Sequence, residues 1–445
     1  MGQCCSSVRG DLASPKSYSS SEDFSGSSER LGDSSLRGGV GVGSGASTER
    51  GGSEARAAST NGVKASGRNR LTPRPGIPDA KHFGLEETHV VLDVLGRGGE
   101  GSAWLMREIK SNSLCAVKLI KRPVPQVLLP FLSQEISIQA QLGRQHENII
   151  DLEGIILTPY FLCIVLEYAS GGPLTRYICE RAQNQNPRNQ GPPTSSRRLF
   201  LPEKEALYFF KQFISAVQFC HNNGFAHRDL KLDNTLLDYN IPPTIKISDF
   251  GFAKGSAEEN TFTTIGTPCY MSPEVLTTST TKKGYNAKRA DVWACGVLLF
   301  AMLFGAFPFD STDHDPNSIT TVHDILEQQL ASVAKEQKWK LPGVNLNLLS
   351  IECQELLRRI FTIDPAKRIS IHDIMEHPWY KQELPETFKE RLEQIRMKQL
   401  AKNEMFTKEG HYFPPFFKEK LSELVIRASK VAEGKEANQS IWLRE

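Results

Sequence analysis

The stretch His227-Arg228-Asp229-Leu230-Lys231-Leu232-Asp233-Asn234 decides how this chain is interpreted. It places a carboxylate, an ammonium group and a carboxamide close together, at Asp229, Lys231 and Asn234. Residues 244–248 predict a short strand, which leads directly into Asp249-Phe250-Gly251. Phosphoryl transfer needs a group that orients a hydroxyl, a cation near the transferred phosphoryl and oxygen ligands for a hard metal ion. The two motifs together therefore indicate phosphoryl transfer.

The order and spacing of these motifs resemble those of the eukaryotic protein kinases, H-R-D-L-x-x-x-N followed by D-F-G. The resemblance implies an α+β fold of two lobes, a small, mostly β lobe at 88–167 and a larger helical lobe at 168–380. Lys231, two residues after Asp229, resembles the serine/threonine kinases. Together with Gly266-Thr267-Pro268, the loop is similar to the calcium/calmodulin-dependent and sucrose-nonfermenting-related groups. The implied activity is transfer of the ATP γ-phosphate to serine or threonine hydroxyls of protein substrates, with Mg²⁺.

A glycine-rich turn, Gly96-Arg97-Gly98-Gly99-Glu100-Gly101, lies near the start of the predicted small lobe. This pattern alone is weak evidence, because dinucleotide-binding folds share it and there a helix begins at the glycines. Here residues 102–106 predict a strand, and a second predicted strand at 114–120 carries Lys118. Strand, glycine turn, strand and lysine resemble the kinase arrangement, in which the turn and the lysine lie over the nucleotide phosphates. A nucleotide-binding oxidoreductase is therefore the weakest hypothesis.

The kinase resemblance also implies how the remaining site residues act. Glu135, on a helix predicted at 133–142, would pair with Lys118, and the chain around Glu167 and Ala169 would hold adenine. Asn234 and Asp249 would hold Mg²⁺. The implied catalytic residues are Asp229, Lys231, Lys118 and Glu135, and the implied nucleotide-binding residues are Gly96, Gly98, Gly101, Ala103, Lys118, Glu167, Ala169 and Leu236.

Two positions depart from the kinase pattern. Ala103 stands where the family has valine, which removes part of the apolar cover over adenine. Gln139 stands where the family usually has an apolar residue that stacks on Phe250, so either Ile138 takes that place or the stack is weaker. These departures are the only support for the alternative hypothesis, a pseudokinase scaffold that binds partners without turnover.

The segment between Asp249 and Glu274 resembles a kinase activation segment. Arg228, beside the catalytic aspartate, is typical of kinases switched by phosphorylation, because a cation there needs an added dianion to hold the loop. Thr263 is the first candidate for modification, by an upstream kinase, and Thr264 is the second. The resemblance also implies that Thr267 contacts Asp229 and Lys231. Two further implied contacts are between Glu274 and Arg368 and between Asp291 and the catalytic loop.

The ends of the chain differ from its centre. Residues 1–81 are rich in Ser, Gly and Arg and predict disorder, so residues 1–87 form a tail. Gly2 and Ser6 fit the N-myristoylation pattern, and Cys4 and Cys5 are candidate palmitoylation sites. The alternative is that Gly2, Cys4 and Cys5 occur here by chance and carry no lipid. Two acyl chains hold a protein at a membrane stably, so we expect a cytoplasmic, membrane-associated protein.

Residues 381–445 form an extension beyond the predicted kinase domain. Residues 418–431 predict a basic amphipathic helix, with Leu421, Leu424 and Val425 on one face. In one interpretation, this helix inhibits the kinase or binds a calmodulin-like partner. Packing on the larger lobe is the alternative, and we favour it because apolar helix faces are usually buried.

Composition excludes other classes of protein. The 445 residues carry a net charge of +2, which predicts no nucleic-acid partner. Nine cysteines without a CxxC pair argue against zinc and for a reducing compartment. Residues 292–309 carry no charge, but glycine and proline near one end favour a buried helix over a membrane span.

Overall fold

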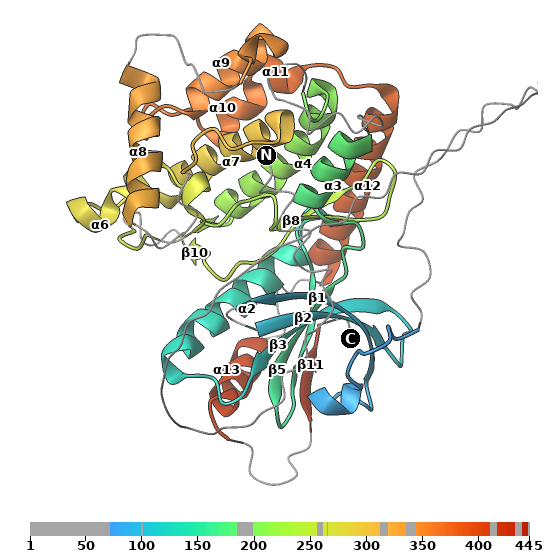
Figure 1. Cartoon of the computed structure of the whole chain (residues 1–445). Coiled ribbons are helices and arrows are strands. Elements are labelled where there is room, and N and C mark those ends of the chain that lie inside the picture. The colour runs from blue at the N-terminus through green and yellow to red at the C-terminus, as the bar shows by residue number, and fades with distance from the viewer. Residues whose placement is uncertain are drawn as a thin grey trace, which may run out of the picture.

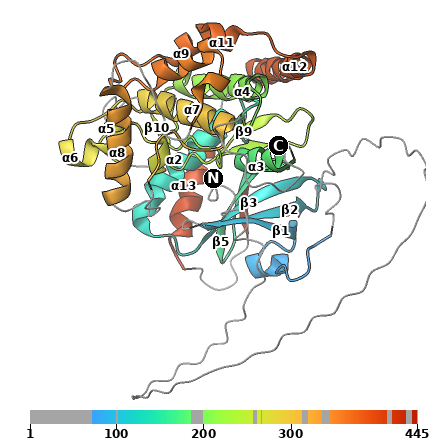
Figure 2. The same ribbon diagram turned by 45° about the horizontal axis from the view of Figure 1, so that its top comes forward.

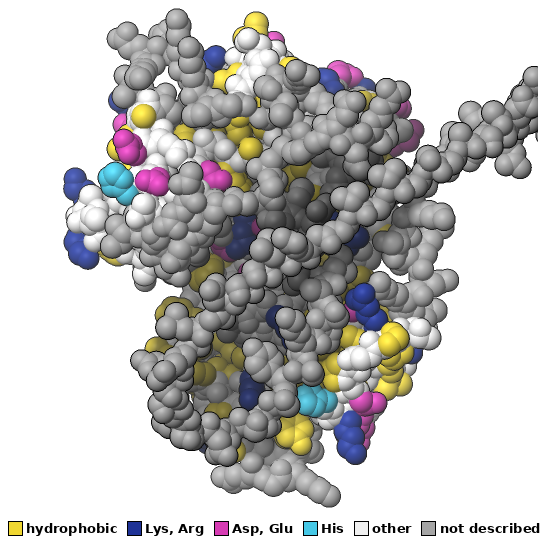
Figure 3. Space-filling view, in the orientation of Figure 1, with side chains coloured by type: hydrophobic (Ala, Val, Ile, Leu, Met, Phe, Trp, Pro, Cys, Tyr) yellow, Lys and Arg dark blue, Asp and Glu magenta, His cyan; other side chains and the backbone are white. Residues whose placement is uncertain are grey.

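The computed structural model describes residues 72–98, 101–184, 199–255, 261–264, 266–311, 319–334, 344–409, 416–431 and 438–443. Figures 1 and 2 show a smaller lobe built on a sheet and a larger lobe of helices. The predicted α+β fold of two lobes is therefore confirmed. In the space-filling view, basic and acidic side chains are interspersed among the described residues on this face (Figure 3), in keeping with the small net charge.

The smaller lobe is built on a six-stranded sheet with the order β1-β2-β3-β5-β4-β11, in which every neighbouring pair is antiparallel. Its first five strands are β1 (His89–Gly98), β2 (Gly101–Glu108), β3 (Leu114–Lys121), β4 (Leu152–Leu157) and β5 (Phe161–Glu167). Side chains alternate between the faces of a strand, and on β3 Cys115, Val117 and Leu119 are buried. Lys118 therefore projects from the opposite face.

A strand, β2, follows the glycine turn, as the sequence predicted. The helix that a dinucleotide-binding fold requires at this point is replaced by a β-hairpin between β1 and β2. This excludes the oxidoreductase hypothesis. Between β3 and β4 lies the helix α2 (Leu129–Gly143), preceded by the short η2 (Gln126–Leu128).

The prediction of a disordered tail through residue 87 is wrong for residues 72–87. Asp79 caps η1 (Ala80–Phe83), and Phe83 and Leu85 are buried against the sheet. The Phe83 ring lies 5.1 Å from Trp104. Two large apolar side chains in a polar segment are enough to fix it once a sheet face is available, although they do not stand out in the sequence.

The larger lobe surrounds α7 (Ala287–Phe304), which is buried along most of its length. Asn286 caps its start, and Gly305 ends it in the left-handed conformation, with φ of 61°. This is the uncharged run of the sequence, and it is a core helix as predicted. Within the described ranges, no helix combines the length and apolarity needed to cross a membrane.

The other described helices of the larger lobe are α3 (Leu174–Asn184), α4 (Glu203–Asn222), η3 (Pro268–Tyr270), α5 (Pro273–Leu276), α6 (Thr278–Thr281), α8 (Ile319–Ala334), η4 (Leu346–Leu348), α9 (Ile351–Ile360), α10 (Ile371–Glu376) and α11 (Pro378–Lys381). Of these, α4 and α9 pack against α7, and α6 lies at the outer edge of the lobe (Figure 1). Short strands line the side that faces the smaller lobe: β6 (Gly172–Pro173), β7 (Phe225–Ala226), β8 (Thr235–Leu237), β9 (Ile245–Ile247) and β10 (Lys254–Gly255). The β8–β9 hairpin carries the two predicted metal ligands at its ends.

The C-terminal extension runs from the larger lobe to the smaller one. It contains α12 (Glu386–Glu409), α13 (Phe416–Ala428) and β11 (Gln439–Trp442). On α12, Arg391 pairs with Asp238 of the larger lobe at 3.1 Å. Further along α12, Gln399 binds the loop that follows α2, accepting from the Glu147 amide at 2.9 Å.

The expectation that residues 418–431 pack on the larger lobe is wrong, because α13 packs on the smaller one. Leu421, Leu424 and Val425 are buried in one apolar cluster with α2, β4 and β5. β11 then pairs with β4 and becomes the edge strand of the sheet. The amphipathic pattern showed which face would be buried, but it held no information about the partner.

Candidate active site

A buried carboxylate anchors the catalytic loop to the central helix. Asp291 of α7 accepts hydrogen bonds from the main-chain amides of His227 and Arg228, both at 2.9 Å, and contacts the His221 ring at 2.8 Å. Burial alone would raise the pKa of Asp291, but the contact with His221 and the donated hydrogen bonds outweigh it and hold the pKa below its ordinary value. The carboxylate therefore stays charged, and the loop is fixed at the contact that the sequence predicted.

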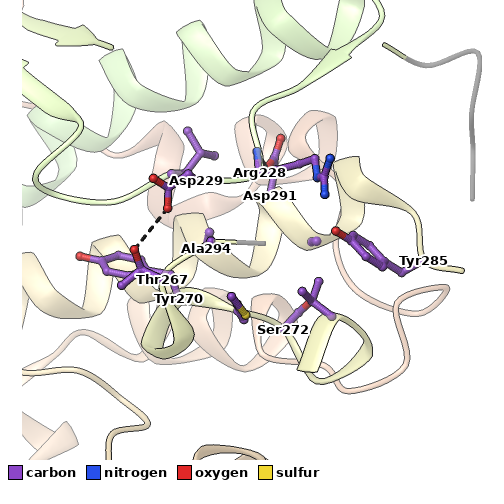
Figure 4. A pocket seen from close by; sticks show the side chains of 13 residues that line it. Arg228, Asp229, Thr267, Tyr270, Ser272, Tyr285, Asp291 and Ala294 are labelled. Carbon is purple, nitrogen blue, oxygen red and sulfur yellow. Dashed lines mark hydrogen bonds between the residues drawn. The ribbon is translucent and has the colours of Figure 1, made fainter. Parts of the chain in front are cut away.

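Asp229 lies at the centre of a polar cluster. Its carboxylate receives the Lys231 ammonium at 2.7 Å, the Asn234 carboxamide at 2.9 Å and the Thr267 hydroxyl at 3.2 Å. Thr267 also receives a hydrogen bond from Lys231, at 3.2 Å. Figure 4 shows the contact between Asp229 and Thr267. The predicted contacts of Thr267 are confirmed, and they fix the orientation of the carboxylate.

Lys118, from β3, forms an ion pair with Glu135, from α2, at 2.7 Å. Asp249 lies close to this pair. A Cβ built at Gly251 would lie 3.4 Å from an oxygen of Glu135 and 3.4 Å from an oxygen of Asp249. The two carboxylates therefore converge on the same point, and the structure brings together residues from a strand, a helix and a loop.

Phe250 is buried beside the catalytic loop, with its ring 4.7 Å from that of His227. Ile138 belongs to the same apolar cluster as Phe250. Gln139 instead donates to the main-chain oxygen of Ile150. Ile138 and Phe250 thus belong to one extended apolar core, whereas the Gln139 side chain binds the main chain.

The glycine turn lies on the same face of the sheet as Lys118. Gly96 pairs with Ala103, and Ala103 pairs with Lys118, so the three residues form a row across the strands. A Cβ at Gly96 would meet no atom within 4 Å, whereas one at Gly101 would collide with the Leu119 carbonyl of β3. The first glycine thus leaves space, as a bound phosphate requires, and the third permits the strands to pack. Gly99 and Glu100 lie outside the described residues.

The segment between the lobes holds a contact that the sequence did not predict. The Glu167 side chain pairs with Lys246 at 2.7 Å and accepts from the Asp151 amide at 3.2 Å. Its side chain is thus engaged, which is consistent with adenine contacting only its main chain. The only hint of this contact in the sequence is Lys246, which stands between two isoleucines of β9. Nearby, Ala169 is buried and Leu236 is half-buried.

Asn234 and Asp249 offer hard oxygen donors for a cation. Asn234 donates its amide nitrogen to Asp229, so its side-chain oxygen is the atom suited to a metal ion. Its main-chain oxygen accepts from the Ser248 amide at 2.9 Å, which holds it beside the residue that precedes Asp249. Among the residues that the structure describes, no group of three or more His, Cys, Asp or Glu forms a metal cluster. A two-residue oxygen set suits Mg²⁺, whose remaining ligands are phosphates and water.

The activation segment is described at residues 251–255, 261–264 and 266–274. Thr263 and Thr264 are both exposed. Arg228 donates to the Thr263 hydroxyl at 2.6 Å, whereas the Thr264 hydroxyl lies 3.5 Å from the Val275 carbonyl oxygen. At the end of the segment, Glu274 receives two hydrogen bonds from the buried Arg368, at 2.6 and 2.9 Å, as predicted.

A small cavity of about 20 Å³ lies between the activation segment and α7. Arg228, Ser272, Tyr285 and Ala294 are among the residues that line it (Figure 4). Tyr285 was not predicted as a functional residue, because a single tyrosine before a helix is not a distinctive signal. The predicted lipidation residues Gly2, Cys4 and Cys5 lie outside the described part of the chain.

Comparison with known proteins agrees with this geometry. The family model of the protein kinase domain matches residues 89–380. The serine/threonine-protein kinase SRK2E of Arabidopsis thaliana is 42% identical over 292 residues, which cover 65% of this chain and 71% of the relative. The serine/threonine-protein kinase SAPK2 of Oryza sativa subsp. indica is 39% identical over 302 residues, 68% of this chain and 78% of the relative.

A third relative, the serine/threonine-protein kinase SRK2A of Physcomitrium patens, is 40% identical over 292 residues, 65% of this chain and 73% of the relative. These relatives fit the predicted sucrose-nonfermenting-related group. The matched region spans both lobes, from β1 to α11. The chain therefore belongs to the protein kinase family, and it is a serine/threonine protein kinase.

Proposed function

We propose that this kinase uses ATP and Mg²⁺, with Asp229 orienting the hydroxyl of the substrate and accepting its proton. The observation that carries the proposal is the approach of the Asp249 and Glu135 carboxylates at Gly251, with Lys118 paired to Glu135. A kinase cleft that is ready for transfer requires the lysine–glutamate pair and the metal-binding aspartate to be in place together.

Each polar residue of the catalytic loop then has a role that its contacts support. Lys231 lies 2.7 Å from Asp229 and would approach the transferred phosphoryl as a point charge. Lys118, aligned by Glu135, would bind the α- and β-phosphates. Asn234 and Asp249 would hold Mg²⁺ through one oxygen each. When bound, the cation neutralises charge on the phosphates more completely than the side chains of this cleft do alone.

The nucleotide-binding surface consists of the glycine turn and the chain between the lobes. The open space at Gly96 and Gly98 lets main-chain amides approach phosphates. Main-chain groups of Glu167 and Ala169 would bind adenine, with Leu236 below it and Ala103 above it. Because Ala103 is smaller than the valine that the family has at this position, the adenine pocket would be larger here. Gln139 donates a hydrogen bond to the Ile150 carbonyl oxygen, and this structural role gives no support to a scaffold without activity.

Phosphorylation of Thr263, by an upstream kinase, would raise the activity. The Arg228 guanidinium already lies 2.6 Å from the Thr263 hydroxyl, so a phosphate added there would meet a cation directly. Thr264 has only a distant contact with a carbonyl, which repels a phosphate. This difference favours Thr263.

The N-terminal motif would hold the kinase at a membrane facing the cytoplasm. Myristate at Gly2 would supply one acyl chain, and palmitate at Cys4 or Cys5 would supply the second that stable attachment needs. A calmodulin-like partner at the C-terminal extension would have to displace α13 from α2, because Leu421, Leu424 and Val425 are buried there. We therefore do not include that partner in the proposal.

Substitution of Asp249 tests the catalytic proposal. Asp249→Asn removes a charge from the proposed Mg²⁺ site and is expected to lower the rate of phosphate transfer to a generic protein substrate by about 10²–10³-fold. Glu390→Gln, which neutralises an exposed carboxylate on α12, should leave the rate unchanged. Equal rates for Asp249→Asn and the unmodified protein would defeat the proposal.

Substitution of the two threonines tests the proposed switch. The protein phosphorylated by an upstream kinase should be more active than the dephosphorylated protein, because the Arg228–phosphate contact fixes the segment. Thr263→Ala should abolish this increase, and Thr264→Ala should retain it. Activation that survives in Thr263→Ala and disappears in Thr264→Ala would move the site to Thr264.

Cell fractionation tests the membrane proposal. Gly2→Ala keeps the α-amine but removes the glycine that the N-myristoylation motif requires, so it should shift the kinase from the membrane fraction to the soluble fraction. Gly10→Ala, in the same tail, is the matched control and should not move it. An unchanged distribution of Gly2→Ala would exclude myristate as the main attachment.

A further inference from the structure

Tyr285, in the loop between α6 and α7, holds the activation segment through three hydrogen bonds. Its main-chain amide and carbonyl pair with those of Thr261, at 3.0 Å in each direction. Its phenol donates to the Thr263 carbonyl oxygen, also at 3.0 Å. Tyr285 is buried, and Thr261 is completely buried. One buried residue, Tyr285, thus binds two residues of the segment, Thr261 and Thr263.

Arg228 binds the same part of the segment. Its guanidinium donates to the Thr263 hydroxyl at 2.6 Å and to the Thr263 carbonyl oxygen at 3.3 Å. The carbonyl oxygen therefore receives hydrogen bonds from both Arg228 and Tyr285, whose side chains lie next to each other in Figure 4. Arg228 and Tyr285 thus both bind the main chain of Thr263, and Arg228 also binds its hydroxyl.

The phenol of Tyr285 remains a donor under ordinary conditions. Burial raises its pKa, which keeps the hydroxyl protonated at neutral pH. Arg228, Asp291 and Glu274 are the charged groups whose fields act on it, and the first of these partly offsets the effect of burial. The hydroxyl is directed at the Thr263 carbonyl oxygen of the segment.

We propose that Tyr285 is a positioning residue that docks the activation segment before Thr263 is phosphorylated. The unmodified kinase then has a basal activity that depends on the Tyr285 hydroxyl. A phosphate on Thr263 would bind Arg228 through stronger, charge-assisted hydrogen bonds and would make the hydroxyl dispensable. This inference rests on the proposed function, because a role of Tyr285 in basal activity requires that the chain transfers phosphate.

Tyr285→Phe is the direct test, because it removes one hydroxyl and keeps the ring and the main-chain pairing with Thr261. Initial rates of the full-length chain on a generic protein substrate are measured with Thr263 unmodified and with Thr263 phosphorylated, and mass spectrometry verifies each state. We expect kcat/KM of the unmodified form to fall about fivefold, the factor that loss of one ordinary hydrogen bond gives. The phosphorylated form should match the phosphorylated unsubstituted protein.

Tyr380→Phe is the matched control. Tyr380 is also buried, and its hydroxyl donates to the Lys211 carbonyl oxygen at 3.2 Å, away from the segment. This variant should keep its rate in both states. Unfolding midpoints of the two variants verify that each is folded.

Two results would overturn the inference. One is an unmodified Tyr285→Phe kinase that is as fast as the unmodified original. The other is an equal loss in both phosphorylation states, which would show a general structural role. If the unsubstituted protein transfers no phosphate at all, the proposed function itself is overturned. If it transfers phosphate at a rate that does not depend on the Tyr285 hydroxyl, only this inference is overturned.

Discussion

The ion pair between Lys118 and Glu135 is the contact on which the arrangement of the cleft depends. It joins β3 to α2, and it sets the distance between the sheet and the helix at the point where Asp249 also approaches. The pair does not supply the stability that holds α2, because its side chains are 22% and 14% exposed and such pairs contribute little net free energy. Its role is to align the lysine.

Apolar packing on the other side of α2 supplies that stability. Leu132, Ile136 and Ala140 recur at helical spacing and are buried in one cluster with α13. Burying a leucine or isoleucine side chain contributes about 1.5–3 kcal/mol, which exceeds the contribution of a partly exposed ion pair. The C-terminal extension therefore completes the core of the smaller lobe. Because α12 also binds the larger lobe and the loop after α2, the extension connects the two lobes outside the cleft.

The sequence predicted those parts of the molecule that have a local signature. The buried helix α7 followed from an uncharged run, and the catalytic loop followed from the chemistry and spacing of Asp229, Lys231 and Asn234. The order of the segment at 72–87 was missed, because Phe83 and Leu85 are fixed by contacts with side chains of the sheet, such as Trp104, and not by a pattern within the segment. The location of α13 was predicted wrongly for the same reason. β11 has four residues, which are too few for a periodic pattern. Tyr285 was missed because only the folded structure brings its hydroxyl to Thr263.

The phosphate-transfer rate of Glu135→Gln at saturating ATP tests whether the ion pair with Lys118 aligns the cleft for catalysis. The amide keeps the size of the side chain and removes the charge that aligns Lys118. The account predicts a rate about 10²-fold lower, as misplacement of a catalytic group gives, with an unchanged unfolding midpoint. A rate equal to that of the unsubstituted kinase would contradict it, because the cleft would then be assembled without the ion pair.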